Sequence, residues 1–458
     1  MIRPIPDSHG VGFFSMERLP QHAGVYREEN VGRYWNYYVT PQCQEWPEKL
    51  MDMLNAVDKR PYVIDGFSPN LNKSLHVGHL RQLALAKSLS AILPQTGAKF
   101  VAILGASQGV YKYAFEQLND WFKFVAYEPQ LYYDVLMPKD QDIVVRYKKM
   151  MPYVDPLARG TANWGDLKVA VPTEKEQECT VWDGPKGPVI VERWDGRPTY
   201  AFADIAFAKT VGPTHYITGA EQQDHFASLG LGEKHLPMGL VLGADNKKMK
   251  SRTGDSVTAA EIMEQIIARF DPTPEPKKLA WNVLAWNLLH VARPKNVKYT
   301  PEEWTKPEAP GMYITYTYAR IKSALKGLDG LWFPPWQIKG VKKKFQPQPA
   351  EDREFDYEAA CKKWSDENPD PEYDLTQGDA DLIGFSKQNH YVLCRCIESL
   401  DPAQIANYAY ALAAKLGVAY HSEKIQGGRY GFKHAIYEAV STLRRCMWHL
   451  GMFDLEKV

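Results

Sequence analysis

Short apolar runs alternate with stretches of helical periodicity between residue 60 and about residue 293. In those stretches the apolar residues recur every three to four positions, as on the buried face of a helix. Strands that alternate with helices are typical of a parallel sheet with helices on both faces. The pattern therefore predicts an α/β domain with a doubly wound parallel sheet over 59–309. The runs predicted to be its strands are 61–65, 99–104, 188–191, 214–219 and 237–242.

Two segments depart from this alternation. Residues 111–187 are charged and rich in tyrosine, and we predict them to be an insertion on the sheet. Residues 1–58 are rich in aromatic side chains but show little periodicity, which predicts a short N-terminal extension packed on the next domain.

Beyond residue 310 the chain reads as mostly helical, so we predict a separate all-α domain over 310–458. A segment that contains proline and lysine, 332–344, interrupts it as a linker. The helices predicted in this half of the chain, including the one that precedes the domain, are 277–292, 312–327, 377–398, 402–420 and 431–450.

Charge and composition restrict the function only a little. The chain has 55 Lys+Arg and 55 Asp+Glu, and a neutral total neither supports nor excludes a nucleic-acid partner. No apolar run is long enough to cross a bilayer, and the N-terminus lacks the apolar core of a signal peptide. We therefore expect a cytoplasmic protein without membrane segments. The C-x-C spacing of Cys394 and Cys396 fits no zinc or thioredoxin motif, so the cysteines are expected to be reduced, buried thiols.

Two histidines, His76 and His79, stand at the start of a helical pattern directly after the predicted strand 61–65. Residues three apart on a helix share one face. The free N–H groups and the dipole at a helix N-terminus favour phosphate. Gly78, between the histidines, leaves room for an adenine ring to approach the backbone. This arrangement predicts a site for a nucleotide polyphosphate.

A basic segment, 247–255, follows the predicted strand 237–242. The carboxyl ends of successive strands in a doubly wound sheet meet at one crevice. Positive charge there can neutralise charge that develops on a transferring phosphoryl group. A lysine-rich loop alone is usually solvated surface, and a lone pair of histidines is more often structural. Both together, each after a strand, are far more specific.

At these residues the sequence resembles the class I aminoacyl-tRNA synthetases, and within them the arginyl-tRNA synthetases. His76-Val-Gly-His79 resembles the HIGH signature, and Lys248-Met-Lys-Ser-Arg252 resembles the KMSK loop. The segment 68–81 reproduces the S-P-N-x-x-K-x-x-H-V-G-H-L-R pattern of the arginyl subgroup. Ser251 replaces the second lysine of KMSK, and Lys73 stands where the subgroup carries a lysine thought to compensate.

The resemblance implies a Rossmann-type catalytic domain that activates arginine with ATP and transfers it to tRNA(Arg) through an arginyl-adenylate, with Mg²⁺ bridging phosphate oxygens. The implied catalytic residues are His76, His79, Lys73, Lys248, Lys250 and Arg252. ATP would be bound by Gly78, His76, His79, Lys248 and Met249. Arginine would be bound by Asp65, Ser68, Asn70, Tyr200, Asp204, Gln222 and Gln223.

Asp204 is also a candidate on physical grounds. It lies in an otherwise apolar helical run, four residues after Tyr200 and on the same face. A half-buried carboxylate needs a cation, because an isolated buried charge is costly. By resemblance this cation is the guanidinium of arginine; the alternative is a structural Arg or Lys. Asp65 stands where the family tends to carry Glu.

The C-terminal region resembles the DALR-type helical domain that binds the anticodon, most clearly over 401–417. Arg429 and Arg444 are among its candidate phosphate contacts, and Tyr408 is among its candidates for stacking on bases. Two alternatives stay open: a ligase that delivers activated arginine to an acceptor other than tRNA, and a catalytically silent RNA-binding paralogue. We expect a monomer.

Overall fold

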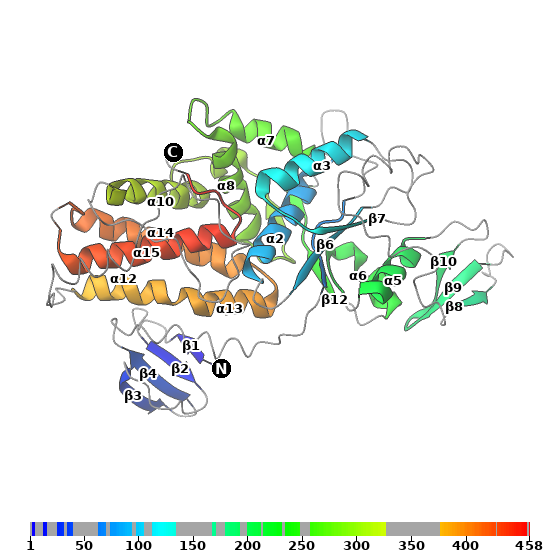
Figure 1. Cartoon of the computed structure of the whole chain (residues 1–458), viewed down its shortest axis with the longest axis horizontal. Helices are drawn as coiled ribbons and strands as arrows, with labels where there is room; N and C mark the ends of the chain where they lie inside the picture. The colour runs from blue at the N-terminus through cyan, green and yellow to red at the C-terminus, as the bar shows by residue number, and fades with distance from the viewer. Residues whose placement is uncertain are drawn as a thin grey trace, which may run out of the picture.

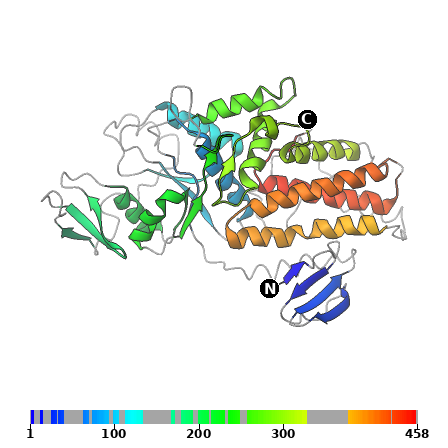
Figure 2. The ribbon, with the colours of Figure 1, turned by 180° about the vertical axis from the view of Figure 1, so that it is seen from behind.

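In the part of the chain that it describes, the computed structural model consists mainly of helices and strands (Figure 1). A parallel sheet lies between a helical bundle at one end of the molecule and a small antiparallel sheet at the other, in both the front and the back view (Figures 1 and 2). The described residues are 2–4, 12–15, 25–31, 34–39, 63–69, 74–93, 98–104, 112–133, 167–170, 179–192, 199–211, 214–230, 234–247, 257–326, 376–426, 428–455 and 458.

The parallel sheet confirms the doubly wound α/β fold. Its strand order is β12-β11-β5-β6-β7, and every neighbouring pair is parallel. The order reverses between β5 and β11, and in open α/β sheets ligands bind in the crevice at that point. The strands are β5 (Val63–Asp65), β6 (Lys99–Leu104), β7 (Gln130–Tyr133), β11 (Thr214–Gly219) and β12 (Lys234–Met238).

Three strand predictions need correction. The predicted insertion 111–187 contains helix α3 (Lys112–Val125) and the sheet strand β7, so the start of that range belongs to the sheet itself. The predicted strand 188–191 lies in a separate antiparallel sheet. The predicted strand 237–242 is divided between the end of β12 and β13 (Val241–Leu242), which pairs with β14 (Val297–Lys298).

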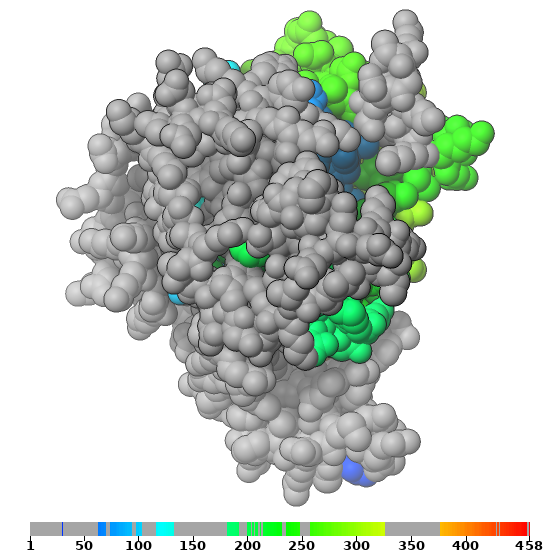
Figure 3. Space-filling view, turned by 90° about the vertical axis from the view of Figure 1, so that its right-hand side faces the viewer, coloured from blue at the N-terminus to red at the C-terminus, as the bar shows by residue number. Residues whose placement is uncertain are grey.

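The separate sheet has the order β10-β9-β8 and stands at the surface (Figure 3). Its strands are β8 (Leu167–Ala170), β9 (Cys179–Gly184) and β10 (Gly187–Glu192). Ile190 in β10 is 39% exposed, whereas a strand inside a covered parallel sheet would be buried on both faces. An apolar run alone does not distinguish the two settings, which is why 188–191 was assigned to the wrong sheet.

Helix α8 (Pro276–Leu289) joins the α/β half of the molecule to the helical bundle. Every residue from 279 to 289 is buried, as expected of a helix with neighbours on all sides. The indole N–H of Trp281 donates to Gly451 O at 2.8 Å, and that of Trp286 donates to Ala406 O at 2.8 Å. One hydrophobic core continues from β5 through α8 to the last helix of the chain.

The C-terminal half is helical, as predicted, but the predicted helix 377–398 is two helices that meet at Gln388. The hydroxyl of Tyr408 donates to the carbonyls of Phe385 and Ser386 at the end of the first one. Tyr408 is therefore a core residue rather than a surface for bases. The helices are α10 (Pro310–Lys326), α12 (Gln377–Lys387), α13 (Asn389–Ser399), α14 (Ala403–Ser422) and α15 (Tyr430–His449).

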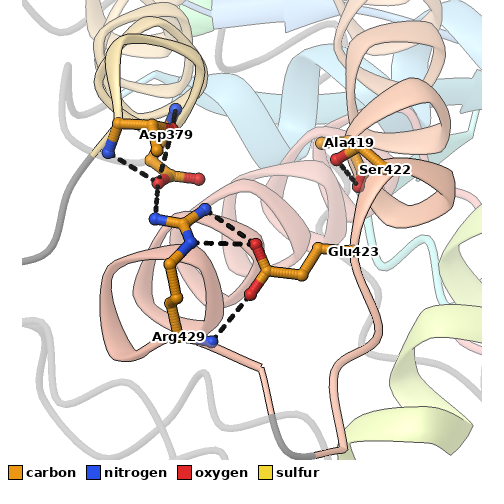
Figure 4. Close-up of polar contacts among 6 residues, drawn as sticks. Asp379, Ala419, Ser422, Glu423 and Arg429 are labelled. Carbon is orange, nitrogen blue, oxygen red and sulfur yellow. Dashed lines mark hydrogen bonds and ion pairs between the residues drawn. The ribbon is translucent and has the colours of Figure 1, made fainter.

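Arg429 precedes α15 and holds two carboxylates (Figure 4). Its guanidinium donates to Glu423 Oε2 at 2.8 and 3.0 Å and to Asp379 Oδ2 at 2.8 Å. Asp379 also caps the start of α12 through Thr376. This network joins α12, α14 and α15, so a structural role for Arg429 accounts for its charge better than a phosphate contact does.

Two further features complete the fold. The buried thiols of Cys394, Cys396 and Cys446 are free, and burial raises the pKa of each to about 12. The N-terminal segment, which was predicted only as a short extension, contains an antiparallel sheet of order β1-β2-β4-β3. The N-terminal strands are β1 (Ile2–Pro4), β2 (Gly12–Ser15), β3 (Val25–Val31) and β4 (Tyr34–Val39).

Within the part of the chain that the structure describes, no helix has the length and hydropathy to cross a membrane.

Candidate active site

The two predicted histidines form the N-terminus of α2 (Val77–Ile92), beside the reversal point of the sheet. His76 is the N-cap: its Nδ1 accepts the N–H of Gly78 at 3.1 Å. The Nδ1 of His79 accepts the N–H of His76 at 3.0 Å. The two rings stack with centroids 3.8 Å apart and an interplanar angle of 23°. Each ring therefore satisfies an N–H group that the helix start would otherwise leave unpaired.

These bonds decide which ring nitrogen carries the proton. A nitrogen that accepts a hydrogen bond is unprotonated, so the neutral ring bears its proton on Nε2. Burial, with a smaller contribution from His76, lowers the pKa of His79 to about 3. At neutral pH His79 is thus a neutral N–H donor. Such a donor can bond a phosphate oxygen without contributing a charge of its own.

The imidazole of His76 leaves little room for a side chain at Gly78. A Cβ at this position would lie 2.9 Å from Cε1 and 3.1 Å from Nδ1 of His76. Carbon atoms in real structures rarely approach so closely, so any side chain here displaces the ring. The packing of the His76 ring against Gly78 therefore favours glycine here, independently of the predicted contact with adenine.

Replacing Gly78 by alanine is expected to lower activity about tenfold, because ångström-scale displacement of a positioned group costs one to two orders of magnitude. The helix itself should be little affected, since alanine is the better helix former. The steady-state rate and the thermal unfolding temperature measured on one preparation separate the two effects. A variant with an unchanged rate would show that the His76 ring position is unimportant.

The chain that follows the basic segment returns to His76. The chain enters the segment through β13 and a turn in which Gly243 N donates to Lys247 O at 2.8 Å. Beyond the segment, Thr258 is the N-cap of α7 (Ala259–Ile267) and forms a β-bridge with His76. Ala259 N donates to Leu75 O at 2.8 Å. Lys248, Met249, Lys250 and Arg252 lie outside the described residues.

Asp65 ends β5 on the acidic side of the crevice. It is 5% exposed and accepts a hydrogen bond from the hydroxyl of Ser68. Burial raises the pKa of Asp65 to about 7; the Ser68 bond opposes this rise and the charge of Asp204 adds to it. Two of the predicted arginine-binding carboxylates therefore act on one another across the site.

Asp204 lies on α5 (Tyr200–Val211), and its Oδ2 is 2.7 Å from Nε2 of His225 on α6 (Gln223–Leu229). Among the described residues the hydrogen-bonded partner is thus a histidine rather than a structural Arg or Lys. Sequence reasoning did not single out His225, although it stands two residues after Gln223.

The remaining predicted residues are placed only in part. Tyr200, at the start of α5, is 53% exposed. Gln222 closes the 3-10 helix η2 (Ala220–Gln222) after β11, and Gln223 begins α6; both are exposed at the carboxyl end of the sheet. Asn70 and Lys73 lie outside the described residues.

Comparisons with known proteins agree with this arrangement, although no protein-family model matches the chain. An arginine–tRNA ligase of Synechococcus sp. (strain CC9605) is 25% identical over 291 residues, which cover 46% of this chain and 49% of that protein. One from Acanthamoeba polyphaga mimivirus is 19% identical over 358 residues, 59% of each chain. The chain spans about half the length of the curated relatives it matches.

Solved structures share the fold over nearly the whole chain. The Thermus thermophilus arginyl-tRNA synthetase has a TM-score of 0.60 at 15% identity and covers 96% of this chain and 90% of its own. The arginyl-tRNA synthetase of Plasmodium falciparum has a TM-score of 0.61 at 13% identity, with 96% and 87% covered. The doubly wound sheet followed by a helical half is the fold of these arginyl-tRNA synthetase structures. The curated relatives that the sequence matches are arginine–tRNA ligases.

Proposed function

We propose that the protein activates arginine with ATP and transfers it to tRNA(Arg), acting in the cytoplasm. One observation carries the proposal: the bridge between His76 and Thr258 holds the chain just after the basic segment against the start of the histidine helix. A nucleotide in the crevice would then meet neutral donors from one signature and cations from the other. The printed names of the curated relatives support the same activity.

The chemistry needs positioning and electrostatics rather than a covalent enzyme intermediate. The carboxylate of arginine attacks the α-phosphorus of ATP; the new P–O bond forms as the bond to pyrophosphate breaks. Nε2–H groups of His76 and His79 donate to phosphate oxygens, and Lys73, Lys248 and Lys250 neutralise the developing charge. A hydroxyl of the terminal adenosine of tRNA then attacks the arginyl carbonyl and releases AMP.

Two carboxylates suit arginine, because the free amino acid carries an α-ammonium and a guanidinium. We propose that Asp204 accepts the guanidinium, whose fork of N–H donors matches a carboxylate. Asp65, buried at the end of β5, would accept the α-ammonium, with Asn70 beside it. Tyr200, Gln222 and Gln223 would complete the arginine site from α5 and α6.

Arginine binding is expected to strengthen about tenfold between pH 6 and pH 8, on the titration of one site. In the free protein Asp65, with its pKa of about 7, is largely protonated at pH 6 and ionised at pH 8. A cation binds the ionised form, so binding releases a proton below pH 7. Calorimetry in buffers of different ionisation enthalpy measures that release. An Asp65→Asn variant should bind weakly with no pH dependence, and wild-type affinity that is level across this range would exclude the role.

The remaining partners follow from the same proposal. Among the described residues no group of three or more His, Cys, Asp and Glu is arranged to hold a metal. Mg²⁺, which would supply charge neutralisation at the phosphates, would therefore be carried by ATP oxygens. The helical bundle would contact tRNA through surface residues other than Tyr408 and Arg429, which the fold itself uses. A monomer stays our prediction.

Arginine-dependent exchange between pyrophosphate and ATP, run with and without tRNA, tests the function. Exchange that depends on both arginine and tRNA, followed by arginyl-tRNA formation, is the expected result. Exchange without tRNA and without transfer to it would favour an enzyme that delivers arginine to another acceptor. No exchange in either condition would favour the silent RNA-binding paralogue.

A further inference from the structure

A buried arginine, Arg81, lies on the same helix as the two site histidines. Its side chain is completely buried on α2, two residues after His79. Its guanidinium bonds no carboxylate among the described residues; instead it donates to five backbone carbonyls. These acceptors are Leu288 (3.3 Å), Gly239 (2.7 Å), Lys295 (2.7 Å), Val291 (3.5 Å) and Ala292 (3.4 Å).

The position of these carbonyls explains how a cation is stable there. Leu288, Val291 and Ala292 lie at and just beyond the C-terminus of α8. A helix C-terminus has carbonyls without partners and the negative end of the dipole. Burial lowers the pKa of Arg81 to about 10, so it is still charged at neutral pH. A lysine ammonium has fewer donors and lacks the planar fork, and it cannot satisfy these acceptors together.

Of the other two acceptors, Gly239 lies on the route into the basic segment, and Lys295 lies in the segment that is bonded to it. Gly239 follows β12, and its N–H donates to Arg293 O at 2.9 Å. Leu240 N donates to Asn296 Oδ1 at 2.8 Å, and β13 then pairs with β14 on the way to Lys247. The segment 239–242 is thus bonded to 293–298, and Arg81 donates to both segments.

Arg293 extends the connection to the helical bundle. Its guanidinium donates to Pro237 O at 2.8 Å and to Leu400 O at 3.2 Å. Its backbone N–H donates to Asp401 Oδ2 at 2.8 Å. The segment that leads to the basic signature is therefore hydrogen-bonded by Arg81 of the histidine helix. It is also bonded to Arg293, which in turn is bonded to the residues before α14.

We propose that Arg81 is a positioning residue for the nucleotide site, which fixes the segment 239–247 relative to the helix that carries His76 and His79. The inference rests on the proposed function of that site. Arg81 does not touch the substrate; it acts by fixing the chain that enters the basic segment, up to Lys247, relative to the rings of His76 and His79. The proposed arginine-binding residues Asp65 and Asp204 lie on elements to which Arg81 donates no hydrogen bond. The binding of arginine should therefore not depend on Arg81.

The test compares Arg81→Lys with Arg269→Lys, which makes the same change in an exposed pair with Glu302. Arg81→Lys is expected to raise KM for ATP or lower kcat about 10- to 100-fold, the range for ångström-scale misplacement. Its KM for arginine should stay within about twofold of wild type, and Arg269→Lys should behave as wild type. Equal changes in both KM values, or no change in kcat and in either KM, would overturn the proposal.

A second variant keeps the test open if Arg81→Lys fails to fold. A Cβ at Gly239 would lie 2.3 Å from the carbonyl carbon and oxygen of Lys295, so Gly239→Ala separates the same two segments without touching the arginine. Gly239→Ala should raise KM for ATP or lower kcat, while KM for arginine stays near the wild-type value. An equal rise in both KM values would contradict the positioning role of Arg81. If wild type catalyses no exchange, the proposed function fails. The positioning role of Arg81 is then tested by amide hydrogen exchange over 239–247, whose rate must rise in Arg81→Lys and not in Arg269→Lys.

Discussion

Replacing His76 by alanine is expected to slow arginyl-adenylate formation about 100- to 1,000-fold, the usual cost of removing one positioned donor to a developing anion. The hydrogen bond that Nδ1 of His76 accepts from Gly78 fixes the orientation of the ring and leaves the proton on Nε2. The ring is therefore preorganised before ATP binds. A single-turnover measurement of adenylate formation at saturating ATP, arginine and tRNA reports the step directly.

His76 is also a helix cap, and its loss costs stability as well as rate. His76→Asn separates the two, because asparagine is among the best N-cap residues and its side-chain oxygen can accept from the N–H of Gly78. The asparagine variant should recover the unfolding temperature lost in His76→Ala while its adenylation rate stays low. Recovery of the rate together with the cap would falsify the assignment of His76 to phosphate.

Replacing Asp204 by asparagine is expected to raise KM for arginine about 10- to 100-fold, the range for a hydrogen bond to a charged group. Asparagine keeps the shape of the side chain and can still accept from Nε2 of His225, so the fold around α5 and α6 should persist. Only the negative charge offered to the guanidinium is removed. Arginine-dependent exchange at saturating ATP gives the KM.

Citrulline, the uncharged analogue of arginine, sharpens this test. Wild type should prefer arginine strongly, and Asp204→Asn should lose most of that preference because the charge that enforces it is gone. The matched control is Asp224→Asn, on α6 and paired with Lys186 at the surface. If Asp224→Asn and Asp204→Asn lose the preference equally, long-range charge rather than a contact at Asp204 is responsible.

Local sequence signals located several elements, and some of them to the residue. β6 and β11 have the predicted bounds, since glycine or proline punctuates the chain next to each apolar run. The helix 377–398 was predicted as one because periodicity continues through Gln388. The break depends on Tyr408, a residue from another helix, and nothing in the local pattern reveals it.

The site shows the same division. The spacing of His76 and His79 predicted that they act together, and they stack. The neutral state of His79 comes from its burial in the folded chain, which spacing alone does not give. Arg81 looked like part of a signature, yet its acceptors lie 158 to 214 residues away along the chain. His225 and Asp204 are 21 residues apart, on two helices whose packing no spacing rule gives.

The shared burial of α8 has a consequence for how this molecule is divided. Trp281 and Trp286 bond to backbone of the bundle, and a single core runs through both halves. A catalytic fragment cut after residue 309 would leave the indole N–H groups without acceptors and expose a tryptophan-lined surface. The two domains are therefore one cooperative folding unit, and evolution or engineering can exchange the bundle only together with the helix that it encloses.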